Sequence, residues 1–195
     1  MQNFLRHQLW PAVVLLLALT VITGVIYPAA IAAVGQVAFP NQANGSFIMT
    51  TDGRTIGSTL IGQAFSDPKY FWGRLSAAGS DGYDANASAG SNLGPTNATL
   101  IQRVQDSVTT YQAQNGNAPI PVDLITTSAS GLDPHISPAA AAYQVARVAA
   151  ARGMSQADVQ AVVDRHTEGA LLGFLGQPRV NVLLLNLDLD GLLAK

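Results

Sequence analysis

The stretch that decides the fold is AVVLLLALTVITGVIYPAAIAAV, residues 12–34. No Lys, Arg, Asp or Glu occurs between Arg6 and Asp52, and this stretch is almost wholly apolar. A helix needs about 20 apolar residues to cross the hydrocarbon core of a bilayer. The stretch therefore predicts a transmembrane helix over 12–34, with a short segment (1–11) on one side of the membrane and a domain (35–195) on the other.

The charges that flank the span predict its orientation. Lys and Arg near the ends of a membrane helix favour the cytoplasmic side. Arg6 lies on the N-terminal flank, and residues 35–51 contain neither Lys nor Arg. We expect a single-pass protein with a cytoplasmic N-terminus and an extracytoplasmic domain. Within the span, Thr20 and Gly24 are small residues four apart that could let another helix approach closely, although ordinary lipid-facing residues give the same pattern.

A cleaved signal peptide is the alternative interpretation of the apolar stretch. Ala30 and Ala32 form an A-x-A-like cleavage site behind it. The apolar run is longer than the usual signal core of about 7–15 residues, so an uncleaved anchor is favoured. The alternative function is a secreted ligand-binding domain released by cleavage near Ala32.

Composition excludes several classes of function. The net charge is -2, the charged fraction is 11%, and the Lys and Arg residues are scattered, so we expect no nucleic-acid partner. The chain has no cysteine, which excludes disulfides, cysteine metal sites and thiol nucleophiles. What remains after the span is enough for one domain.

The first part of that domain combines turn signals with one helical pattern. Asp52-Gly53 within residues 50–55 predicts a hairpin between two short strands. Residues 74–96 are rich in Gly, Ser, Ala and Asn, which predicts a long loop. From Thr96 to Asn115 an amphipathic helix is expected, because apolar side chains recur on one helical face: Leu100, Val104, Val108 and Tyr111.

Three further elements are expected toward the C-terminus. Ser137, which precedes a proline, predicts a helix N-cap, and Gly153 predicts the end of that helix. Ser155 and the acidic residue three positions later predict another helix that reaches roughly residue 167. Residues 180–192 alternate leucine with Asn or Asp, which predicts a strand with one wet face. The chain is therefore expected to be one transmembrane helix followed by a small α+β domain.

Motifs for catalysis and metal binding are missing from the sequence. It contains no Gly-Lys-Ser or Gly-Lys-Thr, no G-x-S-x-G and no HExxH. GSNLGP, residues 90–95, could offer backbone N–H groups to an anion, or it could be a tight structural turn. Asp133 and His135 lie in a proline-punctuated loop that leads to a helix, so we expect a structural role and no acid–base pair. We expect no catalytic residue, no metal site and no firmly bound cofactor.

Four strings together resemble one known family. They are GSTLIGQAFSDPKYFWGR (57–74), SAGSNLGPTN (88–97), PVDLITTSASGLDPHISPAAA (121–141) and QPRVNVLLLN (177–186). They are similar to the C subunit of the Kdp potassium-transporting P-type ATPase, over the membrane helix and nearly the whole outer domain. The sequence departs from the family at Leu75, where proline is expected, and at Ala89, where glycine is expected.

The resemblance implies a role and a set of partners. It implies a bacterial inner-membrane pump with a potassium-channel-like A subunit, an ATP-hydrolysing B subunit and a small F subunit. The C subunit is implied to be a non-catalytic accessory chain that stabilises the complex. It is also implied to be a catalytic chaperone that raises the ATP affinity of the B subunit, with ATP held in a transient complex with that subunit.

The residues that we expect to carry partner or nucleotide-linked contacts are loop residues of these strings. They are Arg74, Ser91, Asn92, Gly94, Asp133, His135 and Ser137. The predicted orientation conflicts with direct ATP contact, because a bilayer core about 30 Å thick would separate an outer domain from cytoplasmic ATP.

Overall fold

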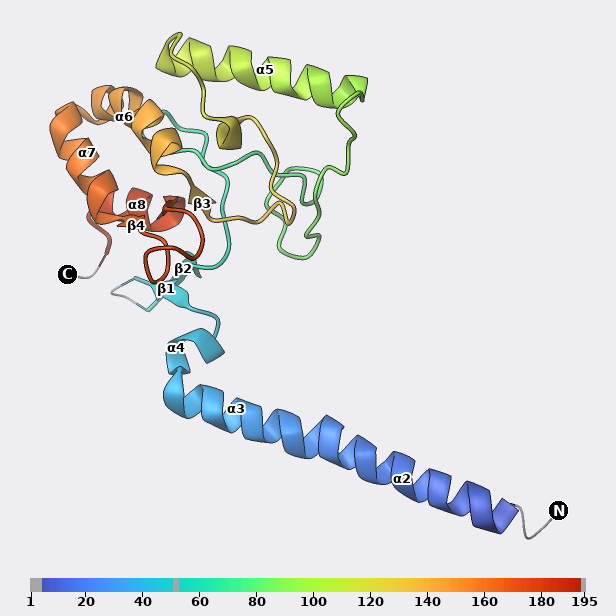
Figure 1. Cartoon of the computed structure of the whole chain (residues 1–195). Helices are drawn as coiled ribbons and strands as arrows, with labels where there is room; N and C mark the ends of the chain where they lie inside the picture. The colour runs from blue at the N-terminus through green and yellow to red at the C-terminus, as the bar shows by residue number, and fades with distance from the viewer. Residues whose placement is uncertain (1–4, 51–52, 194–195) are drawn as a thin grey trace. The chain divides into compact units, whose positions relative to one another are not determined.

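The computed structural model describes residues 5–50 and 53–193 of the chain (Figure 1). Its contacts divide the chain into a unit that ends at Phe47 and a unit that begins at Ile48. The first unit is a long apolar helix with a short extension, and the second is a small α+β domain. The predicted fold class is confirmed.

The N-terminal helix runs without interruption from Leu5 to Ala38, and none of its residues is buried. It is long and apolar enough to cross a membrane, as the 12–34 stretch predicted. The helical run contains four successive segments: η1 (Leu5–Leu9), α2 (Trp10–Val21), η2 (Ile22–Ile26) and α3 (Tyr27–Ala38).

The π-helical segment η2 ends at Ile26, two residues before Pro28. Proline lacks the N–H that would bond the carbonyl four residues back, and its ring crowds that carbonyl. The N–H of Tyr27 bonds the carbonyl of Ile22, five residues back. A wider turn therefore precedes the proline, which lets the helix continue through Pro28.

A short helix, α4 (Pro40–Ala43), is followed by the expected hairpin. Its strands are β1 (Phe47–Met49) and β2 (Thr55–Ser58), which pair with one another. Gly53 has a φ of 81°, a conformation that glycine adopts without a steric penalty. The Thr51-Asp52 part of the predicted turn lies outside the described residues.

The unit that begins at Ile48 is called the outer domain, after its predicted side of the membrane. Its described part combines four α-helices with a small sheet (Figure 1). The sheet order is β3-β5-β4, with both pairs antiparallel. The register pairs His135 with Asn181 and Thr167 with Val180. The elements of the domain are α5 (Ala98–Asn115), η3 (Val122–Leu124), β3 (His135–Ile136), α6 (Pro138–Arg152), α7 (Gln156–Arg165), β4 (Thr167–Glu168), β5 (Arg179–Asn181) and α8 (Val182–Leu189).

Side-chain caps explain why three of these helices begin where they do. The side chains of Asn97, Ser137 and Ser155 each accept a hydrogen bond from an N–H of the first turn. Each cap satisfies a donor that has no partner within the helix. At the other end, Gly153 closes α6 with a φ of 65°. The predicted helices at 96–115, 138–152 and 155–167 are confirmed, with α7 ending at Arg165.

The predicted strand over residues 180–192 is wrong beyond its first residues. Only Arg179–Asn181 is a strand, and Val182–Leu189 is helix α8. The side chain of Asn181 accepts the Leu184 N–H and so caps the helix. Leucine favours helices, whereas strands favour β-branched and aromatic residues. The alternation of leucine with Asn or Asp in residues 180–192 therefore lies mostly within a helix that is buried on most sides.

Two buried amide side chains hold the extended segment Phe71–Trp72 between α6 and α8. Asn186 accepts the Phe71 N–H at 2.8 Å and donates to the Phe71 carbonyl at 3.0 Å. Gln144 accepts the Trp72 N–H at 2.8 Å and donates to the Trp72 carbonyl at 3.1 Å. Neighbouring residues of an extended chain present their polar groups to opposite sides, so each helix satisfies one residue. The backbone groups of Phe71 and Trp72 are thus hydrogen-bonded by side-chain amides. In a sheet, a neighbouring strand would make these bonds.

Candidate functional site

Arg74 joins two loops of the outer domain. It lies at the start of the long 74–96 loop, and that whole segment is irregular apart from a single bridge at Leu75, as predicted. Its guanidinium donates to Asp133 Oδ2 at 3.1 Å and to the Thr127 carbonyl at 3.2 Å. The Tyr83 hydroxyl donates to the Arg74 carbonyl at 2.6 Å. Burial raises the pKa of Tyr83 to about 12, so this donor stays protonated at neutral pH.

Asp133 and His135 lie against one another in the segment that leads to α6, and the expectation of a structural role for them stays a prediction. Asp133 Oδ1 accepts the His135 N–H at 3.0 Å and lies 3.5 Å from His135 Nδ1. Alternate residues of an extended segment lie on the same side of the chain, which explains the contact. Burial alone would raise the pKa of Asp133, but hydrogen bonds from His135 and Arg74 outweigh it and hold the pKa below its ordinary value.

The hydroxyl group of Ser137 caps the N-terminus of helix α6. Its hydroxyl donates to Asp123 Oδ1 at 3.2 Å and accepts the Ala140 N–H at 3.0 Å. Its own N–H donates to Asp123 Oδ2 at 2.8 Å. The carboxylate of Asp123 therefore fixes the start of α6, and the serine oxygen is not held as a nucleophile.

These side chains surround a cavity of about 730 Å³. Arg74, Asp133, His135 and Ser137 all line it. Arg179 lines it from β5, and its guanidinium is paired with Glu168 at 2.9 Å. The structure thus brings together four of the seven predicted loop residues, from strings that lie far apart in the sequence.

The sequence strings that form this cavity match those of one protein family. The family model described as the c chain of the K+-transporting ATPase, KdpC, matches residues 9–191. The chain belongs to the KdpC family.

Relatives in three bacteria support the assignment over nearly the full length. The chain is 60% identical to the potassium-transporting ATPase KdpC subunit of Sorangium cellulosum over 186 residues, which cover 94% of this chain and 97% of the relative. The KdpC subunit of Methylococcus capsulatus is 58% identical, with 93% and 96% covered. That of Caulobacter vibrioides is 56% identical, with 94% and 92% covered. The chain is therefore a subunit of a P-type potassium-transporting ATPase, as its resemblance implied.

The glycine-rich string of this KdpC chain only partly joins the cavity. Ser91 accepts a hydrogen bond from Thr127, the residue whose carbonyl Arg74 binds. Asn92 and Gly94 are exposed, and no hydrogen bond or ion pair among the described residues links them to the cluster. The left-handed residue is Asn92, with a φ of 51°. Gly94 does not have a positive φ, and a Cβ there would meet nothing within 4 Å.

The glycines of this KdpC chain that do matter for the site lie at close approaches of the backbone. A Cβ on Gly62 would lie 2.7 Å from the Asp133 carbonyl. A Cβ on Gly131, whose φ is 68°, would lie 2.7 Å from the Ala89 carbonyl. These contacts let the loop before α6 lie against two other loops. Local turn motifs in the sequence do not indicate these glycines, because the residues that approach one another are distant in the sequence.

Neither the membrane helix nor the outer domain of this KdpC chain shows a metal site in its described part. No group of three His, Asp or Glu side chains there is placed to hold a metal ion. Thr20 and Gly24 lie on an uncovered face of the helix, with Gly24 inside the π-helical segment η2.

Asp123 is the site residue that sequence reasoning missed, because no local pattern in the sequence links it to Ser137.

Proposed function

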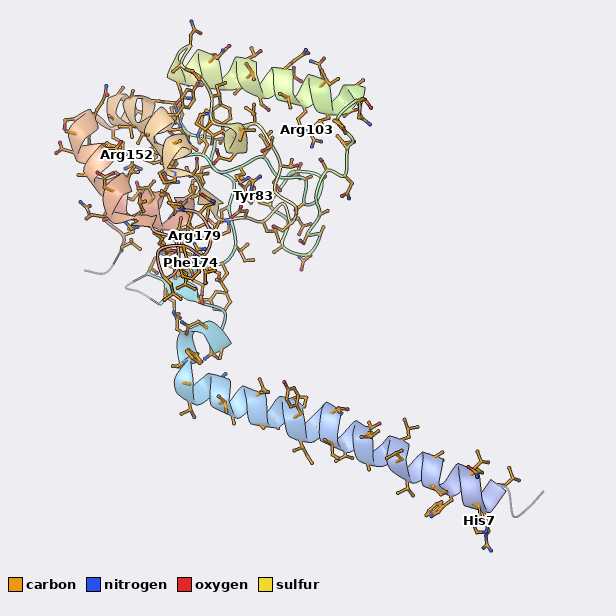
Figure 2. All side chains as sticks on the ribbon, in the orientation of Figure 1. His7, Tyr83, Arg103, Arg152, Phe174 and Arg179 are labelled. Atoms are coloured by element: carbon orange, nitrogen blue, oxygen red, sulfur yellow. The ribbon has the colours of Figure 1, made fainter. Side chains whose placement is uncertain are left out.

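We propose that this KdpC chain is a non-catalytic accessory subunit that docks its outer domain on the other pump subunits through an exposed apolar loop. Leu171, Leu172 and Phe174 are 69%, 76% and 73% exposed. Phe174 is labelled in Figure 2. Contiguous apolar surface of this kind is typical of a protein interface. This loop is the observation that carries the proposal.

The loop is held in shape by its own backbone. The N–H groups of Leu171 and Leu175 each bond the other residue's carbonyl, at 2.8 and 2.9 Å. Gly173 and Gly176 have φ values of 82° and 90°. A loop that is already closed presents its side chains with little further cost of ordering, which favours binding.

The partners that we propose are the potassium-channel-like A subunit, the ATP-hydrolysing B subunit and the small F subunit, in a bacterial inner membrane. Arg74 is paired with Asp133, and Ser137 is paired with Asp123, so these side chains supply shape more than chemistry. The Thr20–Gly24 face is proposed to pack on a membrane helix of the complex. Family membership favours this assembly role over a secreted domain released near Ala32.

The effect on ATP affinity is proposed to be indirect. A subunit that binds one conformation of the pump more tightly shifts the pump toward that conformation, by at most its differential affinity. Couplings of this kind are about 1–3 kcal/mol, or roughly 5- to 150-fold in affinity. The chain would then act as a catalytic chaperone for the B subunit with no firmly bound cofactor, and ATP would be in contact with it at most transiently.

Replacing Leu171, Leu172 and Phe174 together by serine is expected to lower the yield of co-purified A and B subunits at least tenfold. The reason is the loss of the apolar contact area of three side chains, each worth about 1.5–3 kcal/mol when buried. Capture of the complex from membranes through a tag on this chain measures the yield.

The matched control replaces three exposed apolar residues elsewhere, Leu60, Ile101 and Val122, by serine. Both triple variants should keep the circular dichroism of the parent chain, because exposed substitutions change stability little. An unchanged yield of complex from the loop variant would refute docking through this loop.

Orientation has its own test, because the chain has no cysteine. A single cysteine at Ser130, which is exposed, is expected to react in intact cells with a membrane-impermeant maleimide. A cysteine at His7, also exposed, is expected to react only after the membrane is opened. The reverse pattern would place the outer domain in the cytoplasm and reopen direct ATP contact. Ser58 is 8% exposed and is unsuited to labelling.

A further inference from the structure

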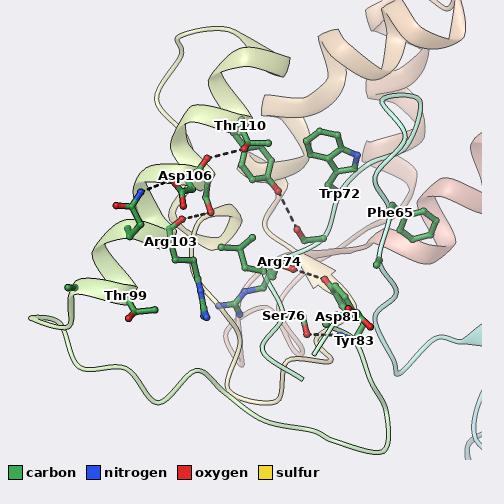
Figure 3. Close-up of a pocket in the computed structure, with 18 residues that line it drawn as sticks. Phe65, Trp72, Arg74, Ser76, Asp81, Tyr83, Thr99, Arg103, Asp106 and Thr110 are labelled. Carbon is green, nitrogen blue, oxygen red and sulfur yellow. Dashed lines mark hydrogen bonds between the residues drawn. The ribbon is translucent and has the colours of Figure 1, made fainter. Parts of the chain in front are cut away.

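A second cavity, of about 880 Å³, lies between helix α5 and the aromatic segment that precedes it in the chain (Figure 3). Four aromatic residues are among those that line it: Phe65, Trp72, Tyr83 and Tyr111. The rings of Trp72 and Tyr111 meet edge to face, with centroids 5.7 Å apart. Aromatic side chains of this kind suit a planar apolar body.

Arg74 and Arg103 line this cavity, and each has one buried nitrogen without a hydrogen-bond partner among the described residues. These nitrogens are Arg103 Nη1 and Arg74 Nε. The other two guanidinium nitrogens of Arg74 already donate hydrogen bonds to Asp133 Oδ2 and to the Thr127 carbonyl. Arg103 has no ion pair with any described residue, so its guanidinium carries an unneutralised charge. An unpaired buried donor is costly, which favours an acceptor from outside the chain.

The first turn of α5 adds to the preference for an anion. Ala98 and Thr99 line the cavity at the N-terminal end of the helix. The helix dipole makes this end electropositive. The turn and the Arg103 guanidinium therefore act together on one region of the cavity.

The other charges limit how much negative charge the cavity can accept. Asp81 and Asp106 also line it, and Asp106 is fixed by a 2.8 Å hydrogen bond from Gln102. Arg74 is neutralised by Asp133. A single guanidinium is left to meet a ligand, and two carboxylates oppose a polyanion. The site therefore fits one negative charge and disfavours a di- or triphosphate.

We propose that this cavity binds a small organic monoanion, a carboxylate carried on a planar apolar body. The carboxylate is held by Arg103, whose planar fork matches carboxylate geometry. The apolar body lies against Trp72 and Tyr111. This site is separate from the apolar loop proposed for docking, so it can be tested without the other subunits.

The test follows the fluorescence of Trp72 in the full chain reconstituted in lipid nanodiscs. The chain has two tryptophans, and Trp10→Phe leaves Trp72 as the only one. The probe is 4-nitrobenzoate, and the matched neutral probe is 4-nitrobenzamide. We expect saturable quenching by 4-nitrobenzoate with an affinity at least tenfold higher than that for the amide. Equal affinities for the two probes would overturn the proposal.

Two arginine variants localise the binding. Arg103→Gln is expected to weaken 4-nitrobenzoate binding at least tenfold. Arg165→Gln makes the same change at a side chain that is 61% exposed on α7, and it is expected to leave binding unchanged. Circular dichroism checks that both variants are folded. Binding unaffected by Arg103→Gln would overturn the proposal.

A third probe, 4-nitrophenyl phosphate, tests the charge limit. At pH 8 it carries close to two negative charges on the same planar body. We expect it to bind at least fivefold more weakly than 4-nitrobenzoate. Tighter binding of the phosphate would show that the cavity is a phosphate site and would overturn the assignment to a carboxylate.

Discussion

Replacing Arg147 by methionine is expected to lower the free energy of unfolding of the outer domain by about 3–5 kcal/mol. Arg147 is 7% exposed, and its guanidinium donates to Asn115 Oδ1 at 2.9 Å and to Gln144 Oε1 at 2.7 Å. It also donates to the carbonyls of Pro68 and Tyr70. Methionine would fill the space and leave several of these oxygens buried without a donor.

The charge of Arg147 is balanced by neutral oxygens and by the face of Trp72, 4.1 Å from the guanidinium carbon. Burial lowers the pKa of Arg147 to about 10, so it stays charged at neutral pH. Arg147→Lys keeps the charge but loses the fork of donors, so most of the destabilisation should remain.

Urea unfolding of the nanodisc-bound chain, followed by Trp72 fluorescence in the Trp10→Phe background, measures the loss. Arg165→Met is the matched control at an exposed position and should change stability by less than about 0.5 kcal/mol. If Arg147→Met cost less than about 1 kcal/mol, the hydrogen bonds of Arg147 would not hold the domain together.

Replacing Asn186 by leucine is expected to cost about 2–4 kcal/mol. Asn186 is 1% exposed, and leucine has the same number of side-chain heavy atoms but a larger volume, so crowding adds to the loss of hydrogen bonds. The N–H and the carbonyl of Phe71 would both lose their partner, and each unsatisfied buried group costs about 1–3 kcal/mol. The same urea titration measures the change.

Asn117→Leu serves as the control for this substitution, because Asn117 is exposed in the turn after α5. We expect it to leave the unfolding midpoint nearly unchanged. Asn186→Asp keeps the size and the acceptor but removes the donor to the Phe71 carbonyl, so it should also destabilise. Full stability of both Asn186 variants would contradict the role given to this amide.

Much of the fold was predictable because its signals are local. The membrane helix follows from one uncharged apolar run, and α5, α6 and α7 follow from caps and periodicity within a few residues of Asn97, Ser137 and Ser155. Helix α8 was mispredicted because its pattern reflects burial by the rest of the domain. Local alternation cannot distinguish such a helix from a strand.

The candidate site was less predictable, because its contacts join distant strings. Arg74 and Asp133 are 59 residues apart, and Ser137 and Asp123 are 14 apart. Resemblance to a family selected these strings, but only the fold shows which side chains meet. Arg103 gave no signal at all, because an arginine on the inner face of an amphipathic helix looks like a break in the pattern.

The position of helix α8 has a consequence for how the protein is made. Its Asn186 binds Phe71, 115 residues earlier, and its leucines lie in the same core. The core cannot close until helix α8 has left the ribosome, because Asn186 and the leucines of α8 are part of it. Until then the growing chain lacks the partner that fixes its central segment. Under the predicted orientation, the chain would cross the membrane through a narrow protein-conducting channel, and an open nascent chain of this kind would pass without being unfolded first.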